Sequence, residues 1–254
     1  MNSAYNETVV YNLAIIKASK KWWKHGFIEK QQLENIQQAY AVQLYHPNLV
    51  IRVLLFMATL FALSGITVFF GLIVAEMNED AIAIACFVYG IVSFFLLEKL
   101  FINKNHFKSG VTEAILYHAC GFTIGGLAGV SDFDNIHVIL WGCLIVFSFS
   151  AIRYLDLLCT LGAAGSFAGI LFFEFYNIGG IFQQIIPFVF IAGFTPIYFW
   201  VKKLKQKINL RLWRNNLLMI ESISLLFIYA AGNYMVVREL SISMMNLELL
   251  LNAS

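Results

Sequence analysis

The stretch VLLFMATLFALSGITVFFGLIVA, Val53–Ala75, decides the fold. It carries no charged residue, and about 20 consecutive apolar residues allow a helix to cross the hydrocarbon core of a bilayer. The rest of the chain has the same character, since 60% of its 254 residues are hydrophobic and 13% are charged, against roughly 25% charged residues in soluble domains. The sequence therefore predicts an all-α protein whose main solvent is the lipid bilayer.

Six further apolar runs follow the first, each bounded by charged or turn residues. Together they predict a polytopic bundle of seven transmembrane helices, at residues 53–75, 81–97, 111–130, 136–152, 155–173, 181–201 and 217–235. The expected domain organisation is a small helical module at residues 1–47, the bundle at residues 48–235 and a short tail at residues 236–254. An odd number of spans places the two ends of the chain on opposite sides of the membrane.

The basic residues indicate the orientation of the bundle. Of the 17 Lys and Arg residues, 16 lie before the first span or in every second connection after it. The intervening connections hold acidic residues such as Glu76, Glu79 and Asp80. Because Lys and Arg collect on the cytoplasmic side of membrane proteins, the amino end is expected in the cytoplasm and the tail outside. No basic stripe remains to indicate a nucleic-acid partner.

Residues 1–47 are expected to form an amphipathic helical hairpin. Gly26 follows a basic segment and suits the end of the first helix, where a positive φ is required. Pro47 is expected to close the second helix. The apolar residues that recur at three- and four-residue spacing in the two helices are Val9, Leu13, Ile16 and Trp23, then Leu33, Ile36, Tyr40 and Leu44.

Trp22 and Trp23 stand beside three lysines at the end of the first predicted helix. Indole rings favour the membrane interface, and lysines favour its anionic cytoplasmic leaflet. Two interpretations follow: the tryptophans dock the hairpin on lipid headgroups or on a cytoplasmic protein, or they pack in the core of the hairpin. Residues 1–47 are therefore a candidate surface for a cytoplasmic protein partner.

The segment WWKHGFIEKQQLENIQQAY, Trp22–Tyr40, resembles the opening of an uncharacterised family of bacterial multi-spanning membrane proteins. The stretches SAIRYLDLL (Ser150–Leu158) and GNYMVVRELSI (Gly232–Ile242) are similar to later parts of the same family. The resemblance implies residence in the bacterial cytoplasmic (inner) membrane and supplies no catalytic residue. It is carried in the first segment by Trp23, Gly26, Phe27, Ile28, Gln32 and Tyr40.

Ionisable residues within or beside membrane spans are costly and are therefore candidate functional residues. His118 is the deepest of them, and either joins two helices by a hydrogen bond or takes part in a proton relay or substrate site. Arg153 and Asp156 are three residues apart, which allows them to pair, and Asp156 suits the start of a helix. The complete candidate polar site comprises Glu113, His118, Arg153, Asp156 and Glu221.

Glycines and prolines mark two further features of the spans. Pro187, Gly193 and Pro196 are expected to kink or interrupt the sixth span. Glycines at four-residue spacing are typical of faces where membrane helices approach closely. These glycine stripes lie in the third span at Gly121, Gly125 and Gly129, and in the fifth at Gly162, Gly165 and Gly169.

No motif for catalysis, metal binding or a cofactor is present. The four cysteines all fall inside apolar runs, without ligand spacing, at Cys86, Cys120, Cys143 and Cys159. The preferred hypothesis is a non-enzymatic scaffold or docking protein with the bilayer as its main partner. The alternative is a small-solute or ion transporter or channel, in which the kinked sixth span lines the pathway.

Overall fold

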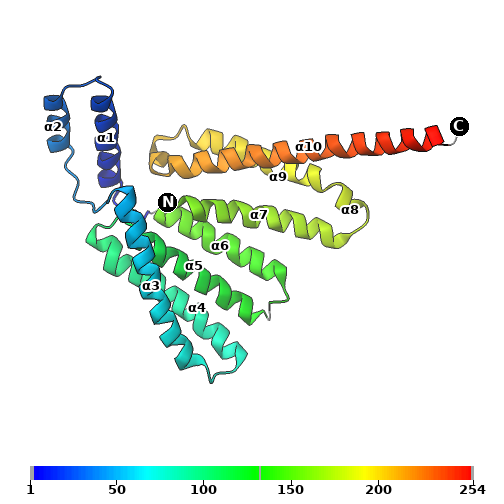
Figure 1. Ribbon diagram of the computed structural model, residues 1–254, viewed down its shortest axis with the longest axis horizontal. Coiled ribbons are helices and arrows are strands. Elements are labelled where there is room, and N and C mark those ends of the chain that lie inside the picture. The colour runs from blue at the N-terminus through cyan, green and yellow to red at the C-terminus, as the bar shows by residue number, and fades with distance from the viewer. Residues whose placement is uncertain (1–2, 132, 253–254) are drawn as a thin grey trace. The chain divides into compact units, whose positions relative to one another are not determined.

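The computed structural model describes residues 3–131 and 133–252. The regular secondary structure of these residues consists of helices, with no β-strand among them (Figure 1). Within the described residues, five helical segments are long and apolar enough to cross a membrane: Leu49–Val74, Glu79–Lys104, Ile136–Tyr154, Leu157–Ile178 and Ile208–Val237. The fold is therefore all-helical, and its apolar helices indicate a membrane-embedded protein.

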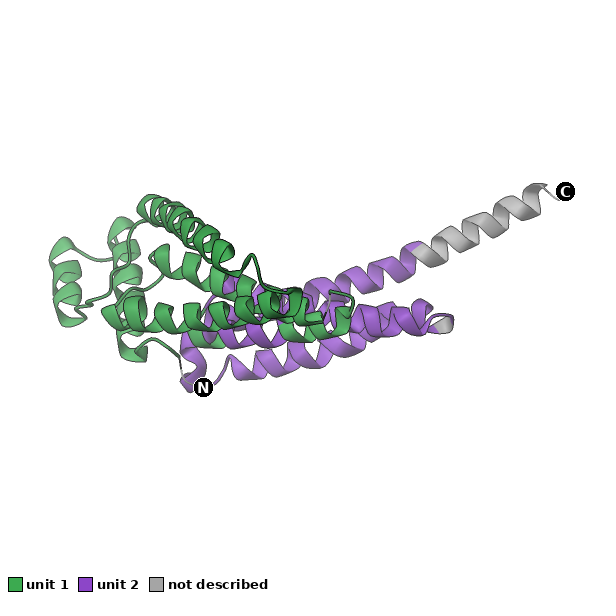
Figure 2. Ribbon diagram, turned by 90° about the horizontal axis from the view of Figure 1, so that it is seen from below, with its two compact units in different colours: residues 1–142, 152–155 green, residues 143–151, 156–254 purple. Residues whose placement is uncertain are grey.

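The chain divides into two compact units, whose boundary runs through one helix (Figure 2). The first unit comprises residues 1–142 and 152–155, and the second comprises residues 143–151 and 156–254. The helix that contributes to both is α6 (Ile136–Tyr154).

The first unit begins with α1 (Glu7–Lys24) and α2 (Lys30–Ala39), which contact each other. It continues with α3 (Leu49–Val74), α4 (Glu79–Leu96) and α5 (Val111–Val130). At the end of α4 the helix widens into the π-helical η1 (Leu97–Phe101) and then tightens into the 3-10 helix η2 (Ile102–Lys104).

The second unit contains α7 (Leu157–Ile178), the short α8 (Ile181–Gln184) and α9 (Ile186–Leu204). A 3-10 helix, η3 (Ile208–Trp213), leads into the long α10 (Arg214–Asn252), which packs against α9 and α7.

Asparagine and aspartate side chains set where four of the apolar helices begin. The side chains of Asn48, Asn78, Asn135 and Asp156 each accept a hydrogen bond from a backbone N–H in the first turn of α3, α4, α6 and α7, respectively. Each bond satisfies a donor that has no partner within the helix. These caps explain why the helices start within a few residues of the predicted spans.

The third predicted span coincides with α5, whereas the second predicted helix of residues 1–47 is too long. It was expected to reach Pro47, but α2 ends at Ala39. Tyr45 instead pairs with the α4–α5 connection: its N–H donates to the carbonyl of Asn105 at 2.9 Å, and its carbonyl accepts from the N–H of Phe107 at 3.2 Å. This long-range pairing uses backbone groups that a longer helix would have required.

At the other end of the chain, α10 continues beyond the span expected at residues 217–235 and runs through most of the expected tail. No Gly or Pro interrupts the sequence after Gly232, and both are the residues that most disfavour a helix. The last two residues of the expected tail, 253 and 254, lie outside the described residues.

The helices α4 and α5 form the closest packing of the first unit. A Cβ added to Gly90 would lie 2.3 Å from Oγ1 of Thr123, and one added to Gly126 would lie 2.4 Å from the backbone nitrogen of Phe87. Such contacts leave no room for a side chain larger than hydrogen, so the two backbones approach directly.

The predicted glycine stripe of the third span describes this contact only in part. Gly129 faces α4, where an added Cβ would lie 2.8 Å from Cβ of Ala83, but Gly121 and Gly125 face open space. In the fifth span an added Cβ on Gly162 would meet the ring of Phe147 at 2.8 Å, whereas Gly165 also faces open space. Four-residue spacing therefore identified Gly129 and Gly162 as packing glycines, but it also included glycines that face open space.

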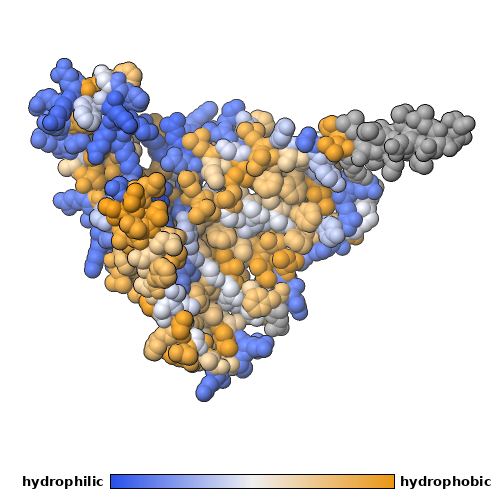
Figure 3. All heavy atoms as spheres, viewed as in Figure 1, coloured by the Kyte–Doolittle hydropathy of each residue, from blue (hydrophilic) through white to orange (hydrophobic). Residues whose placement is uncertain are grey.

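Apolar side chains cover the outside of α3, and hydrophilic side chains cover α1 and α2 (Figure 3). No residue in the most apolar stretch of α3 is buried by the described part of the chain. A soluble protein would bury such a helix, because exposed apolar patches of this size are rare on soluble monomers. Lipid is the solvent that this surface fits.

Candidate functional site

Glu113 is the most buried of the five residues predicted to form the polar site. Its side chain is 8% exposed, and Oε1 accepts a hydrogen bond from Nη2 of Arg52 at 2.5 Å. Oε2 accepts from the N–H of Gly110 at 2.8 Å and from Oγ1 of Thr112 at 3.0 Å. Both carboxylate oxygens thus accept hydrogen bonds, and Glu113 caps the start of α5 by accepting from the backbone N–H of Gly110.

Gly110 allows α5 to begin against α3. Its φ of +91° is one that side chains rarely permit, and an added Cβ would lie 2.1 Å from the carbonyl oxygen of Arg52. Glycine is therefore required at this position for its conformation and for the close approach. The same contact brings Arg52 within reach of Glu113.

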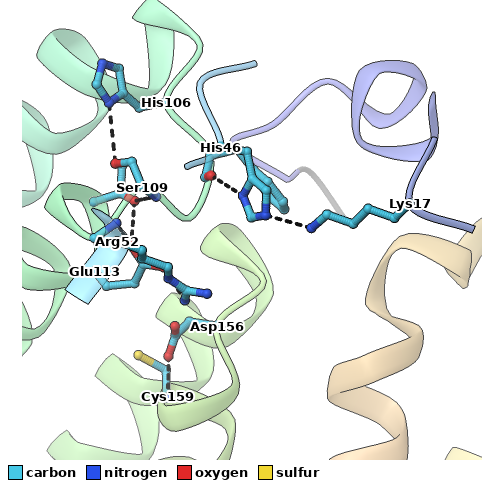
Figure 4. A network of polar contacts seen from close by, with 11 residues as sticks. Lys17, His46, Arg52, His106, Ser109, Glu113, Asp156 and Cys159 are labelled. Carbon is cyan, nitrogen blue, oxygen red and sulfur yellow. Dashed lines mark hydrogen bonds and ion pairs between the residues drawn. The ribbon is translucent and has the colours of Figure 1, made fainter. Parts of the chain in front are cut away.

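A second group of hydrogen-bonded side chains, Lys17 and His46, lies near this ion pair (Figure 4). Nζ of Lys17 lies 2.7 Å from Nε2 of His46, and Nδ1 of His46 lies 3.0 Å from the carbonyl oxygen of Phe107. Burial of the imidazole, together with the positive charges of Lys17 and Arg52, lowers the pKa of His46, while the carbonyl of Phe107 and the carboxylate of Glu113 act in the opposite direction. The contact connects α1 to the segment that precedes α5.

Arg153 forms a bidentate ion pair with Glu98, which lies in η1. Nε donates to Oε1 of Glu98 at 2.8 Å and Nη2 donates to Oε2 at 3.0 Å, while the hydroxyl of Tyr154 donates to Oε1 at 3.1 Å. The rings of Tyr154 and Phe94 stack at 6.1 Å. Sequence spacing pointed only to Asp156 as a partner for Arg153, because Glu98 comes close only in the folded chain.

Asp156 caps α7, as its position at the helix start predicted. Its Oδ1 accepts a hydrogen bond from the N–H of Cys159 at 2.9 Å. Close by, the amide of Asn216 on α10 donates from Nδ2 to the carbonyl oxygens of Ala151 and Asp156 at 3.2 and 3.1 Å, and to Oγ1 of Thr160 at 2.7 Å. Asn216 is buried and holds the start of α10 against these helix ends.

Glu221 pairs with Lys205, the residue that follows α9. The ion pair joins α10 to the end of α9 and is partly buried. It gives Glu221 a structural role where the two helices meet.

His118 lies between two helices and within an aromatic cluster. Its Nε2 lies 3.1 Å from the hydroxyl of Tyr89, so α5 and α4 share a hydrogen bond. Tyr89 stacks on Phe70 of α3 with ring centroids 4.6 Å apart, and Phe122 contacts both rings. Of the two roles that the sequence suggested for His118, this contact corresponds to the interhelical hydrogen bond.

A shallow pocket of about 370 Å³ lies beside His118 on the first unit. It is almost entirely apolar, since glycines and aromatic carbon form most of its wall. Its lining residues are Cys86, His118, Gly121, Phe122, Gly125 and Gly126. The open glycines of the predicted stripe thus form a groove that lipid chains can fill.

Pro187, Gly193 and Pro196 all lie within α9. The sixth predicted span is divided between α8 and α9, just before Pro187. Pro187 lies in the first turn of α9, where a backbone N–H needs no partner within the helix. The helix then continues through Gly193 and Pro196. An added Cβ on Gly193 would lie 2.8 Å from a methyl group of Leu171, so this glycine lets α9 approach α7.

Trp22 and Trp23 are exposed at the end of α1, and Phe27 beyond them is 77% exposed. The turn that presents them is a Schellman motif: the N–H of Phe27 donates to the carbonyl of Trp22 at 2.9 Å, and that of Gly26 to the carbonyl of Trp23 at 3.0 Å. Gly26 has a φ of +75°, as predicted. The motif therefore holds three exposed aromatic residues within one turn at the end of α1, here called the aromatic corner.

Among residues 3–131 and 133–252, no three His, Cys, Asp or Glu side chains lie close enough to share a metal ion. The four cysteines, all within the described residues, form no disulfide. Four of the five predicted polar residues bind a residue of another segment, and the side chain of Asp156 caps its own helix.

No protein-family model, no curated protein and no solved structure matches this chain.

Of the three ion pairs that join helix ends, the sequence indicated Glu113, Arg153 and Glu221 but not their partners. Arg52 and Lys205 were counted only among the basic residues of the connections, and Glu98 was not considered. Each lies at a helix end, one side-chain length from a span residue of opposite charge. A search for oppositely charged residues at ends of spans on the same side of the membrane would have found the three pairs, because only such ends can meet.

Proposed function

We propose that this chain is a non-enzymatic scaffold or docking protein of the bacterial cytoplasmic membrane. The observation that supports the proposal is that all five polar residues predicted as a site have structural partners. A transport path or catalytic centre needs polar groups that face water or substrate. The partners are Arg52 for Glu113, Tyr89 for His118, Glu98 for Arg153, the first turn of α7 for Asp156 and Lys205 for Glu221.

The proposal includes seven spans, with α5 and α9 added to the five strongly apolar segments. The residues Glu113, His118 and several glycines lower the hydropathy of α5, but α5 also contains more buried residues than any other described helix of the first unit. A helix covered by other helices can carry small and polar residues within a membrane. The distribution of Lys and Arg supports a cytoplasmic amino end and an extracytoplasmic carboxyl end.

In this proposal α1 and α2 form a cytoplasmic helical hairpin that binds a cytoplasmic protein. Trp22, Trp23 and Phe27 provide its contact surface, because exposed aromatic side chains are enriched where proteins bind one another. In the view of Figure 3 most of the visible surface of α1 and α2 is hydrophilic, and Trp22 and Trp23 are each 47% exposed.

Site-specific photocrosslinking in cells tests the docking role. A photoreactive residue at Phe27 is expected to give one discrete protein adduct that Trp22→Ala with Trp23→Ala abolishes. The same residue at Glu34, which is exposed on α2, is the control and is expected to give no such adduct. Equal adducts at both positions, or adducts unchanged by the alanines, would contradict docking through this corner.

Reconstitution into liposomes tests the transporter alternative. The proposal expects no flux of ions or small solutes above that of empty vesicles. A flux that falls in Glu221→Gln or His118→Ala would favour transport, since these residues then act in a pathway rather than only between helices.

A further inference from the structure

Basic groups from three separate segments meet around Lys17 and His46, outside the apolar spans. Because the carbonyl oxygen of Phe107 can only accept, Nδ1 of His46 carries the proton and its Nε2 accepts from Lys17. The imidazole is therefore neutral and leaves the charge of Lys17 uncompensated. Lys108 lies over the ring of the same Phe107, with Nζ 5.8 Å from its centroid.

The charges around this point are predominantly positive. Partial burial and the like charges of Lys108 and Arg52 lower the pKa of Lys17. The carboxylate that acts on His46 is Glu113, which also binds Arg52. The three cations and this carboxylate carry a net charge of +2 while His46 is neutral, and an anion placed among them would reduce the repulsion.

Exposed apolar side chains of α3 lie next to Arg52 in the sequence. Arg52 lies in the first turn of α3, where Leu49, Val50, Val53 and Leu54 are between 52% and 72% exposed. A free anion would gain nothing from these side chains. A phospholipid would use both parts, with its phosphate at the cations and its acyl chains along α3.

We propose that the basic cluster formed by Lys17, His46, Arg52 and Lys108 binds the phosphate of an anionic phospholipid headgroup. The cluster holds the headgroup where α3 and α5 begin, and the exposed apolar face of α3 receives the chains. The proposal rests on membrane embedding, but not on a protein partner for the aromatic corner of α1, so either proposal can fail alone.

The pKa of His46 can be used to detect a phosphate bound at the basic cluster. A phosphate within a few ångströms of His46 favours the protonated imidazole and therefore raises the pKa of His46. Nuclear magnetic resonance of carbon-13-labelled histidine measures this titration in nanodiscs, and His46→Gln assigns the signal. The comparison is between nanodiscs of phosphatidylcholine and nanodiscs that also contain phosphatidylglycerol.

The expected result is a higher pKa of His46 in phosphatidylglycerol, and a smaller rise in Lys17→Gln and in Lys108→Gln. Lys104→Gln, in the same connection but outside the cluster, is the matched control and keeps the full rise. Inorganic phosphate added to phosphatidylcholine nanodiscs is expected to leave the pKa unchanged.

Three results would overturn the proposal. One is an unchanged pKa in phosphatidylglycerol, and another is a rise of equal size in all three lysine variants, which would indicate only the general surface potential. An equal rise with inorganic phosphate would assign the cluster to a free anion instead of a lipid.

Discussion

Glu113 and Arg52, 61 positions apart in the chain, form a charge pair that joins the beginning of α3 to the beginning of α5. The carboxylate is 8% exposed and the guanidinium 35% exposed, so the pair is shielded mainly on the glutamate side. Removing the cation would leave a buried carboxylate with its charge uncompensated, which is the costly way to break such a pair.

Arg52→Met is accordingly expected to destabilise the protein by about 2–4 kcal/mol, measured by unfolding in detergent. Lys30→Met is the control, because Lys30 and Glu34 are 3.8 Å apart on an exposed helix face and such pairs contribute less than about 1 kcal/mol. The double variant Arg52→Met with Glu113→Gln is expected to recover part of the loss. Equal stability of the two single variants would show that the buried pair contributes nothing.

Gly126→Ala is expected to disrupt the packing of α4 on α5. The new methyl group would lie 2.4 Å from the backbone of Phe87, and overpacking of this kind typically costs about 1–3 kcal/mol. Gly125→Ala makes the same chemical change one residue earlier, where the added Cβ meets open space. The melting temperature should fall in the first variant and stay unchanged in the second; a similar melting temperature in both would contradict the observed helix face.

His46 is expected to make the first unit less stable in acid. Its pKa in the folded protein lies below the ordinary value of 6.5, so the unfolded chain binds the proton more readily. The stabilisation from neutral His46 is therefore present above pH 6.5 and is lost as the pH falls through the folded pKa.

His46→Gln retains a neutral donor and acceptor at this position and is the matched variant. Between about pH 7 and pH 5 the melting temperature of the wild type is expected to fall by roughly 1–3 °C more than that of His46→Gln. Parallel curves would mean that His46 does not contribute to the pH dependence.

Asn216→Ala is expected to destabilise the second unit by about 1–3 kcal/mol, because it removes a buried amide that serves three acceptors. Asn215→Ala changes the same residue type at the exposed neighbouring position and should cost less than about 0.5 kcal/mol. Thermal unfolding in detergent compares the two variants, and a smaller effect at 216 than at 215 would contradict the role of the amide.

The positions of the helices could be predicted more fully than their contacts. Apolar length placed α3, α5 and α7 correctly to within a few residues, because the bilayer requires a minimum run of apolar residues whatever the neighbours are. The end of α2 could not be predicted, since it depends on Tyr45 pairing with Asn105 and Phe107 from a distant part of the chain.

The candidate site shows the same division between local and distant information. The cap at Asp156 and the positive φ at Gly26 follow from neighbouring residues, and both were predicted. The partners of Glu113 and Arg153 depend on which helix ends meet, and charge spacing along one segment carries no such information. The packing face of α5 was missed for the same reason, because Gly125 and Gly126 are equally small and only tertiary contact distinguishes them.

Reporter fusions at the connections test the proposed orientation. A reporter active only outside the cytoplasm is expected to be active after Glu79 and inactive after Lys205, since these positions lie in connections of opposite charge character. Activity at both positions would exclude the alternating arrangement.

The two attachment points of α3 have a consequence for the membrane around it. Arg52 fixes the helix near one end and Phe70, stacked on Tyr89, fixes it near the other; at 1.5 Å per residue these points are about 27 Å apart. That separation is close to the hydrocarbon thickness of a bilayer, about 30 Å. A helix held at both levels cannot relieve a thickness mismatch by tilting alone, so thicker or thinner bilayers must deform around it or incline the neighbouring helices with it.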